Sequence, residues 1–196
     1  MHFIQNIDIN ILYFIQNNIQ NKFLNPIMIF LTSLGNLGFI WIAISILLII
    51  SKKYRKIGLL TLAVLIVNTL LGEGLLKHII ERSRPFSTYE NLHIMIPKPS
   101  SYSMPSGHTS VSFAVAFMLA YYFKNIRVYI YSLASLIAFS RLYLLVHYPS
   151  DVLTGALLGY LSFLIVIKSY EFIQKSKIKN RSKKVFLDSL WSIFYF

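Results

Sequence analysis

Three short segments between residues 77 and 151 of this 196-residue sequence carry side chains that suit the binding and transfer of an anionic group. Guanidinium and ammonium groups bind phosphate oxygens through charge-assisted hydrogen bonds. A histidine beside a carboxylate is held in one tautomer and can act as a base or a nucleophile. The set predicts phosphoryl transfer without a metal ion, because the carboxylates are too few and too scattered to form a metal site. The segments are Lys77 with Arg84, Pro105 to His108, and Ser140-Arg141 with His147 and Asp151.

The middle segment predicts a helix start that would favour an anion. Pro105 followed by Ser106 is a typical entrance to a helix, with Ser106 near the N-cap. A helix N-terminus offers unpaired backbone N–H groups and the positive end of a dipole. Gly107 leaves room for a close approach, and His108 falls in the first turn beside whatever binds there.

Each segment also has an ordinary structural interpretation when it is considered alone. Glu73 precedes Lys77 by four residues, so the two side chains could form an ion pair on one helical face. Ser106 could be a simple cap, and Asp151 could be the acidic residue that often begins a helix. The combination of the three segments is what favours a reactive site.

The elements that carry these residues are predicted to be membrane helices. Hydrophobic residues make up 56% of the chain and charged residues 13%, about half of the roughly 25% that soluble domains carry. This composition excludes intrinsic disorder and disfavours a water-soluble globule. The chain has no cysteine, which excludes a disulfide framework and a thiolate metal site.

Five apolar stretches are predicted to cross the membrane, since about 20 residues of helix span a hydrocarbon core of about 30 Å. The expected fold is therefore all-α, a polytopic membrane helix bundle that forms a single domain over residues 1–196. The five predicted spans are Pro26–Ile50, Ile57–Ile80, Ser106–Phe123, Val128–Val146 and Val152–Ile167.

The two ends of the chain are predicted to lie outside the spans. Residues 1–22 show apolar side chains at helical spacing with polar residues between them, a pattern too polar to span the membrane. We expect a helix on the outer membrane surface, and a helix packed against the bundle is an equally good interpretation. Residues 168–196 form a basic tail that is expected to be cytoplasmic and to meet anionic lipid head groups.

Positive charge predicts the direction of the spans. Thirteen of the 19 basic residues fall on one side of the predicted bundle, which is the cytoplasmic side by the positive-inside rule. The connection from Glu81 to Pro105 and the turn from His147 to Asp151 then face outward. Nucleic acid is not an expected partner, because these basic residues sit in short loops beside spans. They are Lys52, Lys53, Arg55, Lys56, Lys124, Arg127, Lys168, Lys175, Lys177, Lys179, Arg181, Lys183 and Lys184.

The three segments, in this order and at this spacing, resemble the signature of the type 2 phosphatidic acid phosphatase superfamily, which includes vanadium haloperoxidases and glucose-6-phosphatase. The resemblance covers Lys77 to Asp151, and no signature position departs from the pattern. It implies that His147 is the nucleophile and that Asp151 orients it. His108 is then the general acid for the leaving group and later the base that activates water. The implied phosphate-binding residues are Lys77, Arg84, Ser106, Gly107 and Arg141.

The resemblance implies an integral membrane lipid-phosphate phosphatase with its active site at the outer face of the plasma membrane. It implies no cofactor and no metal, and the expected partners are a lipid phosphate substrate and membrane lipids. Undecaprenyl diphosphate is the favoured substrate. The alternatives are a phosphatidylglycerophosphate or phosphatidate phosphatase, a lipid phosphotransferase, and a transporter or scaffold that binds lipid phosphate without hydrolysis. The sequence indicates no oligomeric state.

Overall fold

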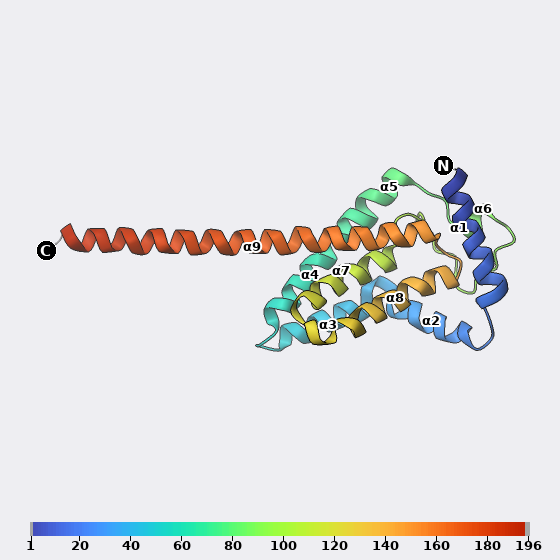
Figure 1. Ribbon diagram of the computed structural model, residues 1–196, viewed down its shortest axis with the longest axis horizontal. Helices are drawn as coiled ribbons and strands as arrows, with labels where there is room; N and C mark the ends of the chain where they lie inside the picture. Colours follow the sequence, from blue (N-terminus) through green and yellow to red (C-terminus); the bar gives the residue numbers. More distant parts are fainter. Residues whose placement is uncertain (1, 195–196) are drawn as a thin grey trace.

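The computed structural model describes the backbone of residues 2–194 and the side chains of residues 3–178. Every regular element in this part of the chain is helical, which confirms the all-α prediction (Figure 1). The basic residues predicted after Ile178 lie outside the described side chains. In chain order the elements are α1 (His2–Phe14), η1 (Ile15–Ile19), α2 (Leu24–Leu34), η2 (Asn36–Gly38), α3 (Phe39–Ile50), α4 (Arg55–Thr69), η3 (Leu70–Leu76), α5 (Lys77–Ile80), α6 (Pro85–Thr88), α7 (Gly107–Tyr122), η4 (Lys124–Ile126), α8 (Arg127–Tyr143) and α9 (Pro149–Phe194).

Some of these helices are long and apolar enough to cross a membrane. Within the described residues, Arg55–Thr88 and Pro149–Ile178 meet this condition, and α2 with α3 would add a third span if the bent pair crosses as one. The helices α7 and α8 have 16 and 17 residues, or about 25 Å at 1.5 Å per residue. The helix predicted to end at Ile167 continues without a break through α9 to Phe194.

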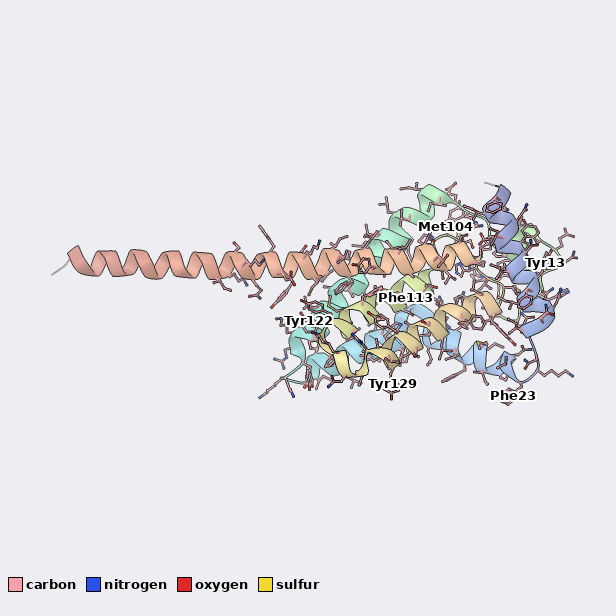
Figure 2. All side chains as sticks on the ribbon, viewed as in Figure 1. Tyr13, Phe23, Met104, Phe113, Tyr122 and Tyr129 are labelled. Atoms are coloured by element: carbon pink, nitrogen blue, oxygen red, sulfur yellow. The ribbon has the colours of Figure 1, made fainter. Side chains whose placement is uncertain are left out.

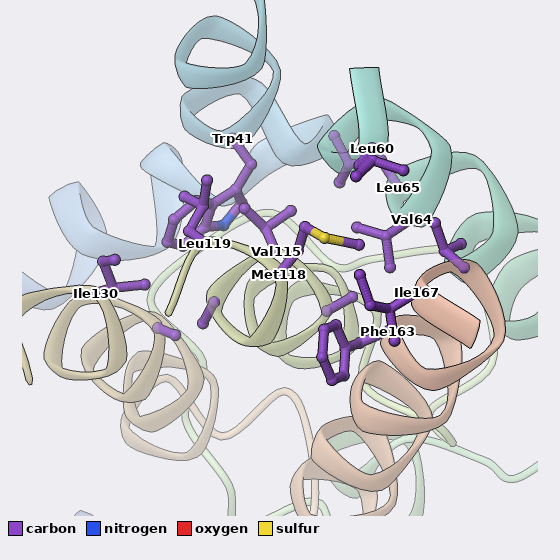
Figure 3. Packing of buried hydrophobic residues seen from close by; sticks show 14 of the residues in the cluster. Trp41, Leu60, Val64, Leu65, Val115, Met118, Leu119, Ile130, Phe163 and Ile167 are labelled. Atoms are coloured by element: carbon purple, nitrogen blue, oxygen red, sulfur yellow. The ribbon is translucent and has the colours of Figure 1, made fainter. Parts of the chain in front are cut away.

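The bundle is built around α7, which packs against α4, α8 and α9. Buried apolar side chains from these helices and from α3 meet in one cluster (Figure 3). Met118 of α7 is completely buried there, beside side chains such as Val64 of α4 and Phe163 of α9. Burial of this apolar surface fixes the position of α7, and the first residues of α7 belong to the predicted site.

The helices α7 and α9 approach each other closely because α9 carries glycine at the contact. A Cβ added to Gly159 would lie 2.7 Å from both the backbone N of Ala114 and the backbone O of Ser110. A Cβ on Gly155 would lie 2.8 Å from the backbone O of Ser106. The close contact sets the start of α9, where Asp151 lies, against the start of α7.

The predicted first span is a broken helix. The helices α2 and α3 meet at an angle of 49°, because Leu37 and Gly38 adopt positive φ angles of 52° and 70°. Such φ values interrupt a right-handed helix and favour glycine. A side chain on Gly35 would collide with the ring of His108, whose Cδ2 would be 2.7 Å from the added Cβ. The break therefore lies directly against the start of α7.

The helix α1 lies across one end of the bundle, near α6 and the start of α9 (Figure 1). Tyr13 of α1 and Tyr122 at the end of α7 mark opposite ends of the bundle in Figure 2. One face of α1, with Leu12 fully buried, packs against the chain from Tyr143 to Tyr148. The opposite face is apolar and exposed, with Phe3 at 77% and Phe14 at 58%. The helix is thus packed against the bundle, which is the second of the two interpretations of residues 1–22.

We predict that Gly159→Ala destabilises the bundle because the new methyl group would push α9 away from α7. Overpacking of a well-packed contact typically costs about 1–3 kcal/mol, so the midpoint of thermal unfolding in detergent should fall by several degrees. Gly74→Ala is the matched control, since nothing lies within 4 Å of a Cβ added there. Equal midpoints for the two variants would contradict the close contact.

Candidate active site

The predicted site residues converge on one cavity of about 720 Å³. Six of the eight line it directly. Ser106 and Asp151 do not line the cavity, and both are fully buried behind it. The six lining residues are Lys77, Arg84, Gly107, His108, Arg141 and His147.

Lys77 reaches the cavity from a helix with a locally widened turn. The π-helical segment η3 precedes it and carries Glu73, whose Oε1 lies 2.8 Å from Lys77 Nζ. Lys77 also donates a hydrogen bond of 3.0 Å to Ser101 Oγ. The ion pair expected from the four-residue spacing is confirmed. Widened turns of this kind occur often at functional sites.

Arg84 is held by oxygen atoms of the loop between α6 and α7 and of the turn before α9. Its Nε donates to the carbonyl oxygen of Ser101 at 2.7 Å, and its Nη1 donates to the carbonyl oxygen of Val146 at 2.9 Å. The residue is 5% exposed. These neutral acceptors fix the guanidinium plane, and none of them cancels its charge.

Arg141 enters from the last turn of α8 and is equally buried. Its Nη1 donates a hydrogen bond of 2.5 Å to Thr32 Oγ1 on α2. Its Nε is buried and has no hydrogen-bond partner in the described structure. Buried donors are almost always paired in folded proteins. The unpaired Nε is therefore an exception to this rule among the described residues.

The start of α7 forms one side of the cavity. Ser106 occupies the N-cap position, but its backbone N–H donates to the carbonyl oxygen of Asp151 at 3.0 Å. Thr109 Oγ1 donates to Ser106 Oγ, so the serine side chain points into the bundle. Gly107 and His108 begin the helix, where N–H groups have no partner in a preceding turn. A side chain on Gly107 would collide with the Glu73 carboxylate, which lies over it.

His108 is positioned by the break between α2 and α3. Its Nε2 lies 3.0 Å from Oδ1 of Asn36, a residue of η2. The ring also lies against Gly35, where a larger residue would displace it. The sequence contained both residues, but no spacing rule relates positions 36 and 108.

His147 lies in the short turn between α8 and α9, with Nε2 3.2 Å from Arg84 Nη1. A guanidinium group can only donate, so Nε2 accepts and the ring proton resides on Nδ1. Nδ1 faces Asp151 Oδ2 at 3.5 Å, a distance longer than a good hydrogen bond, as is common in sites without substrate. Burial, with the charges of Arg141 and Arg84, lowers the pKa of His147 to about 3 against the opposing effect of Asp151. The imidazole is therefore neutral, with a lone pair on Nε2.

Asp151 is held on both carboxylate oxygens. Oδ2 accepts hydrogen bonds from Ser103 Oγ at 2.5 Å and from the backbone N–H of Tyr148 at 2.9 Å. Oδ1 forms an ion pair with Arg82 Nη1 at 2.6 Å. Oδ2 also lies 3.5 Å from His147 Nδ1, so the carboxylate is placed behind the cavity and beside His147.

Sequence reasoning missed several residues that hold the site together. Arg82 is one of the six basic residues that the predicted cytoplasmic side does not include. Its position away from that side was the only sign in the sequence that it could belong to the site. The others come from distant segments, and local spacing carried no sign of them. The missed residues are Asp8, Thr32, Asn36, Arg82, Ser101 and Ser103.

The cavity is amphiphilic. Its cations and helix start suit a phosphate group, and the rest of its wall includes apolar side chains such as Leu37, Ile42 and Leu65. A phosphate ester with an apolar substituent matches both parts of the wall. The neutral His147 faces the same space and can attack such a phosphate.

Residues 57–175 match the PAP2 superfamily. The chain belongs to this superfamily. An undecaprenyl-diphosphatase of Sulfolobus acidocaldarius is 37% identical over 165 residues, which cover 83% of this chain and 79% of that protein. The crystal structure of a transmembrane PAP2 type phosphatidylglycerolphosphate phosphatase from Bacillus subtilis has a TM-score of 0.72 and 30% identity, and covers 88% of this chain and 89% of that one. The structure of Aquifex aeolicus LpxE has a TM-score of 0.73 and 27% identity, with coverage of 83% and 95%.

Membership of the PAP2 superfamily makes the chain a membrane lipid phosphatase, a hydrolase of phosphate esters. The resemblance inferred from the three segments is thereby confirmed. The roles of individual residues in this site rest on the geometry described above.

We predict that Glu73→Gln strengthens inhibition by inorganic phosphate. The Glu73 carboxylate lies against Gly107 and binds Lys77, so it competes with a phosphate for the same cation and helix start. Removal of one nearby negative charge is worth on the order of 1 kcal/mol, or a fall of roughly fivefold in the inhibition constant. Glu90→Gln, which alters an exposed carboxylate outside the cavity, is the control. Weaker inhibition in Glu73→Gln would show that the carboxylate serves to organise Lys77.

Proposed function

We propose that this PAP2 protein hydrolyses undecaprenyl diphosphate to undecaprenyl phosphate at the outer face of the plasma membrane, through a phosphohistidine on His147. The observation that carries the proposal is the position of His147 Nε2 in a cavity shared with three buried cations. The relative from Sulfolobus acidocaldarius, whose name specifies that substrate, supports its choice.

In the first step the lone pair of His147 Nε2 attacks the terminal phosphorus. The bond from phosphorus to the bridging oxygen breaks, and the electron pair leaves with undecaprenyl phosphate. His108, in its protonated form, can give a proton to that oxygen. The phosphorylated imidazole carries positive charge, which Asp151 stabilises through Nδ1.

In the second step water attacks the phosphohistidine. Neutral His108 accepts a proton from the water, and the water oxygen forms the new bond to phosphorus. The phosphorus–nitrogen bond breaks and returns the electron pair to Nε2, which releases inorganic phosphate. The two steps together return His147 and His108 to the forms in which they began the cycle.

The three buried cations supply the electrostatic stabilisation in both steps. Lys77, Arg84 and Arg141 are each at most 5% exposed, so their charges act in a site of low polarity, where they are worth more than in water. They supply the positive charge that divalent ions provide to the transferring group in other phosphoryl-transfer enzymes. We therefore propose that turnover is independent of metal ions.

The proposed orientation places the site outside and the basic loops inside. The turn from α3 to α4 and the turn from α7 to α8 lie together at the end of the bundle opposite α1 (Figure 1). Those turns carry Lys52, Lys53, Lys124 and other basic residues. We propose five spans, formed by α2 with α3, α4 with α5, α7, α8 and α9, and an α1 whose exposed apolar face meets the outer leaflet.

A phosphatidylglycerophosphate phosphatase is the second candidate. The solved Bacillus subtilis structure of that activity is similar to this chain over most of its length. The chemistry would be the same except for the leaving group, which is then a lipid alcohol in place of a lipid phosphate.

We predict that His147→Ala reduces kcat by about 10³-fold or more, since removal of a nucleophile commonly has an effect of this size. Wild-type enzyme mixed briefly with labelled substrate and quenched in base should retain label as phosphohistidine, whereas His147→Ala should retain none. The assay is run in EDTA, where we expect full turnover. His78→Ala, which alters a histidine outside the cavity, is the control. Near-normal activity of His147→Ala would exclude this nucleophile, and loss of activity in EDTA that Mg²⁺ restores would exclude the mechanism.

A substrate panel, with free phosphate as the readout, tests the choice of lipid. We expect the highest kcat/KM for undecaprenyl diphosphate, followed by phosphatidylglycerophosphate and phosphatidate. His108→Ala should impair the two monoesters far more than the diphosphate, because a lipid alkoxide is a strong base that leaves poorly without a proton and a phosphate with a pKa of about 6 leaves without one. Equal rates on all three lipids would contradict any specific substrate. Lipid turnover without free phosphate would indicate a phosphotransferase, and binding without turnover a transporter or scaffold.

A further inference from the structure

The N-terminal helix brings a buried carboxylate to the turn that carries the proposed nucleophile. Asp8 of α1 is 2% exposed. It accepts hydrogen bonds from the backbone N–H of Ser150 at 2.9 Å and from the Ser150 hydroxyl at 2.5 Å. Asp8 lies outside residues 57–175, the part of the chain that matches the PAP2 superfamily. A residue beyond that match therefore contacts the immediate neighbour of Asp151.

Arg82 connects Asp8 to Asp151. Its Nη2 lies 2.7 Å from Asp8 Oδ2, and its Nη1 lies 2.6 Å from Asp151 Oδ1. The guanidinium carbon lies 3.9 Å from the centre of the Tyr148 ring, and Nη1 also donates to Ser150 Oγ at 2.6 Å. One planar cation is thus held between two carboxylates and an aromatic face.

The two oxygens of Asp151 have different partners as a result. Arg82 occupies Oδ1, and Oδ2 is turned toward Nδ1 of His147. If Arg82 moved, Oδ1 would lose its charged partner, while Ser103 Oγ and the Tyr148 N–H would still hold Oδ2. The negative charge that Asp151 presents to His147 therefore depends on the place of Arg82, and that place depends on Asp8.

We propose that Asp8, acting through Arg82, is a positioning residue for Asp151 and hence for His147. The inference rests on the proposed role of His147 as the nucleophile. Asp8 touches neither the substrate cavity nor the reacting atoms.

Charge balance gives the physical reason. With Asp8 present, the charge of Arg82 is shared between two carboxylates, and Asp151 retains negative charge to stabilise the phosphorylated imidazole. Without Asp8, the whole charge of Arg82 faces Asp151 at 2.6 Å. A carboxylate neutralised in this way supports a positive ring less well, so the loss should appear in the chemical step and not in substrate binding.

A purely structural role for Asp8 would be to tether α1 to the bundle. Leu12 provides the matched control, because it is fully buried on the same helix. Its apolar side chain packs in the hydrophobic cluster that also contains Tyr148. Leu12→Ala loosens α1 and leaves the carboxylates and Arg82 in place.

The experiment compares Asp8→Asn, Asp8→Glu and Leu12→Ala in the full-length protein, with undecaprenyl diphosphate as substrate and thermal unfolding measured in parallel. We expect Asp8→Asn to lower kcat by about tenfold, the usual lower limit when an outer-shell partner is removed, with KM changed less than twofold. Asp8→Glu should recover part of the loss. Leu12→Ala should lower the unfolding midpoint at least as much as Asp8→Asn and keep kcat within twofold of wild type.

The inference is overturned if Asp8→Asn keeps the wild-type kcat, or if Leu12→Ala loses kcat to the same extent at an equal loss of stability. If Asp8→Asn does not fold, Asp8→Glu, which keeps the charge and displaces the carboxylate, decides. A partial loss of kcat is expected there, and wild-type kcat overturns the inference. His147→Ala in the same assay separates the failure of this inference from the failure of the proposed function. If the proposed function were wrong, His147→Ala would also keep its activity.

Discussion

Two buried guanidinium groups without a carboxylate partner are the constraint on which the rest of this structure depends. Arg84 and Arg141 are 5% and 3% exposed, and in the described structure their hydrogen bonds go to carbonyl oxygens, hydroxyl oxygens and the ring of His147. Burial of an uncompensated charge costs free energy. In the proposed function a phosphate dianion offsets that cost when it binds, so the burial of the two cations becomes a source of affinity.

Irregular backbone supplies the acceptors and the space that these cations require. The π-helical η3 carries Glu73 to the cavity, the break between α2 and α3 carries Asn36, and the turn before His147 contains Leu145 with a φ of 59°. Non-helical backbone is tolerated at membrane depth where it is buried in protein or lines a cavity. In this bundle these irregular segments gather around the cavity that His108 and His147 line.

The residues that precede the superfamily match contribute direct contacts to the site and do more than attach the chain to the membrane. The match begins at residue 57, yet Asp8, Thr32 and Asn36 all contact residues of the site or its immediate neighbours. The broken α2–α3 pair closes the cavity on one side and holds Arg141 and His108. The similarity to a solved PAP2 structure extends over 88% of this chain, a larger share than the superfamily match.

The sequence alone was sufficient for the all-α class, and six of the eight residues that it predicted for the site line one cavity in the structure. Those predictions depend on local features, which are long apolar runs, helix-start residues, and short spacings such as that from His147 to Asp151. The spacing also predicted the Glu73–Lys77 pair, since positions four residues apart share a helical face.

Only the tertiary structure decided which residues support that site. Asp8 and Arg82, or Asn36 and His108, lie more than 70 positions apart, and they meet because α1 and the broken α2–α3 pair pack against the bundle. The placement of Ser106 was also decided there. The sequence predicted that it would contact phosphate, but the close approach of α9 to α7 engages its N–H with Asp151 and leaves its side chain behind the cavity. Packing of this kind is set by the burial of apolar surface along whole helices, and no short pattern of residues encodes it.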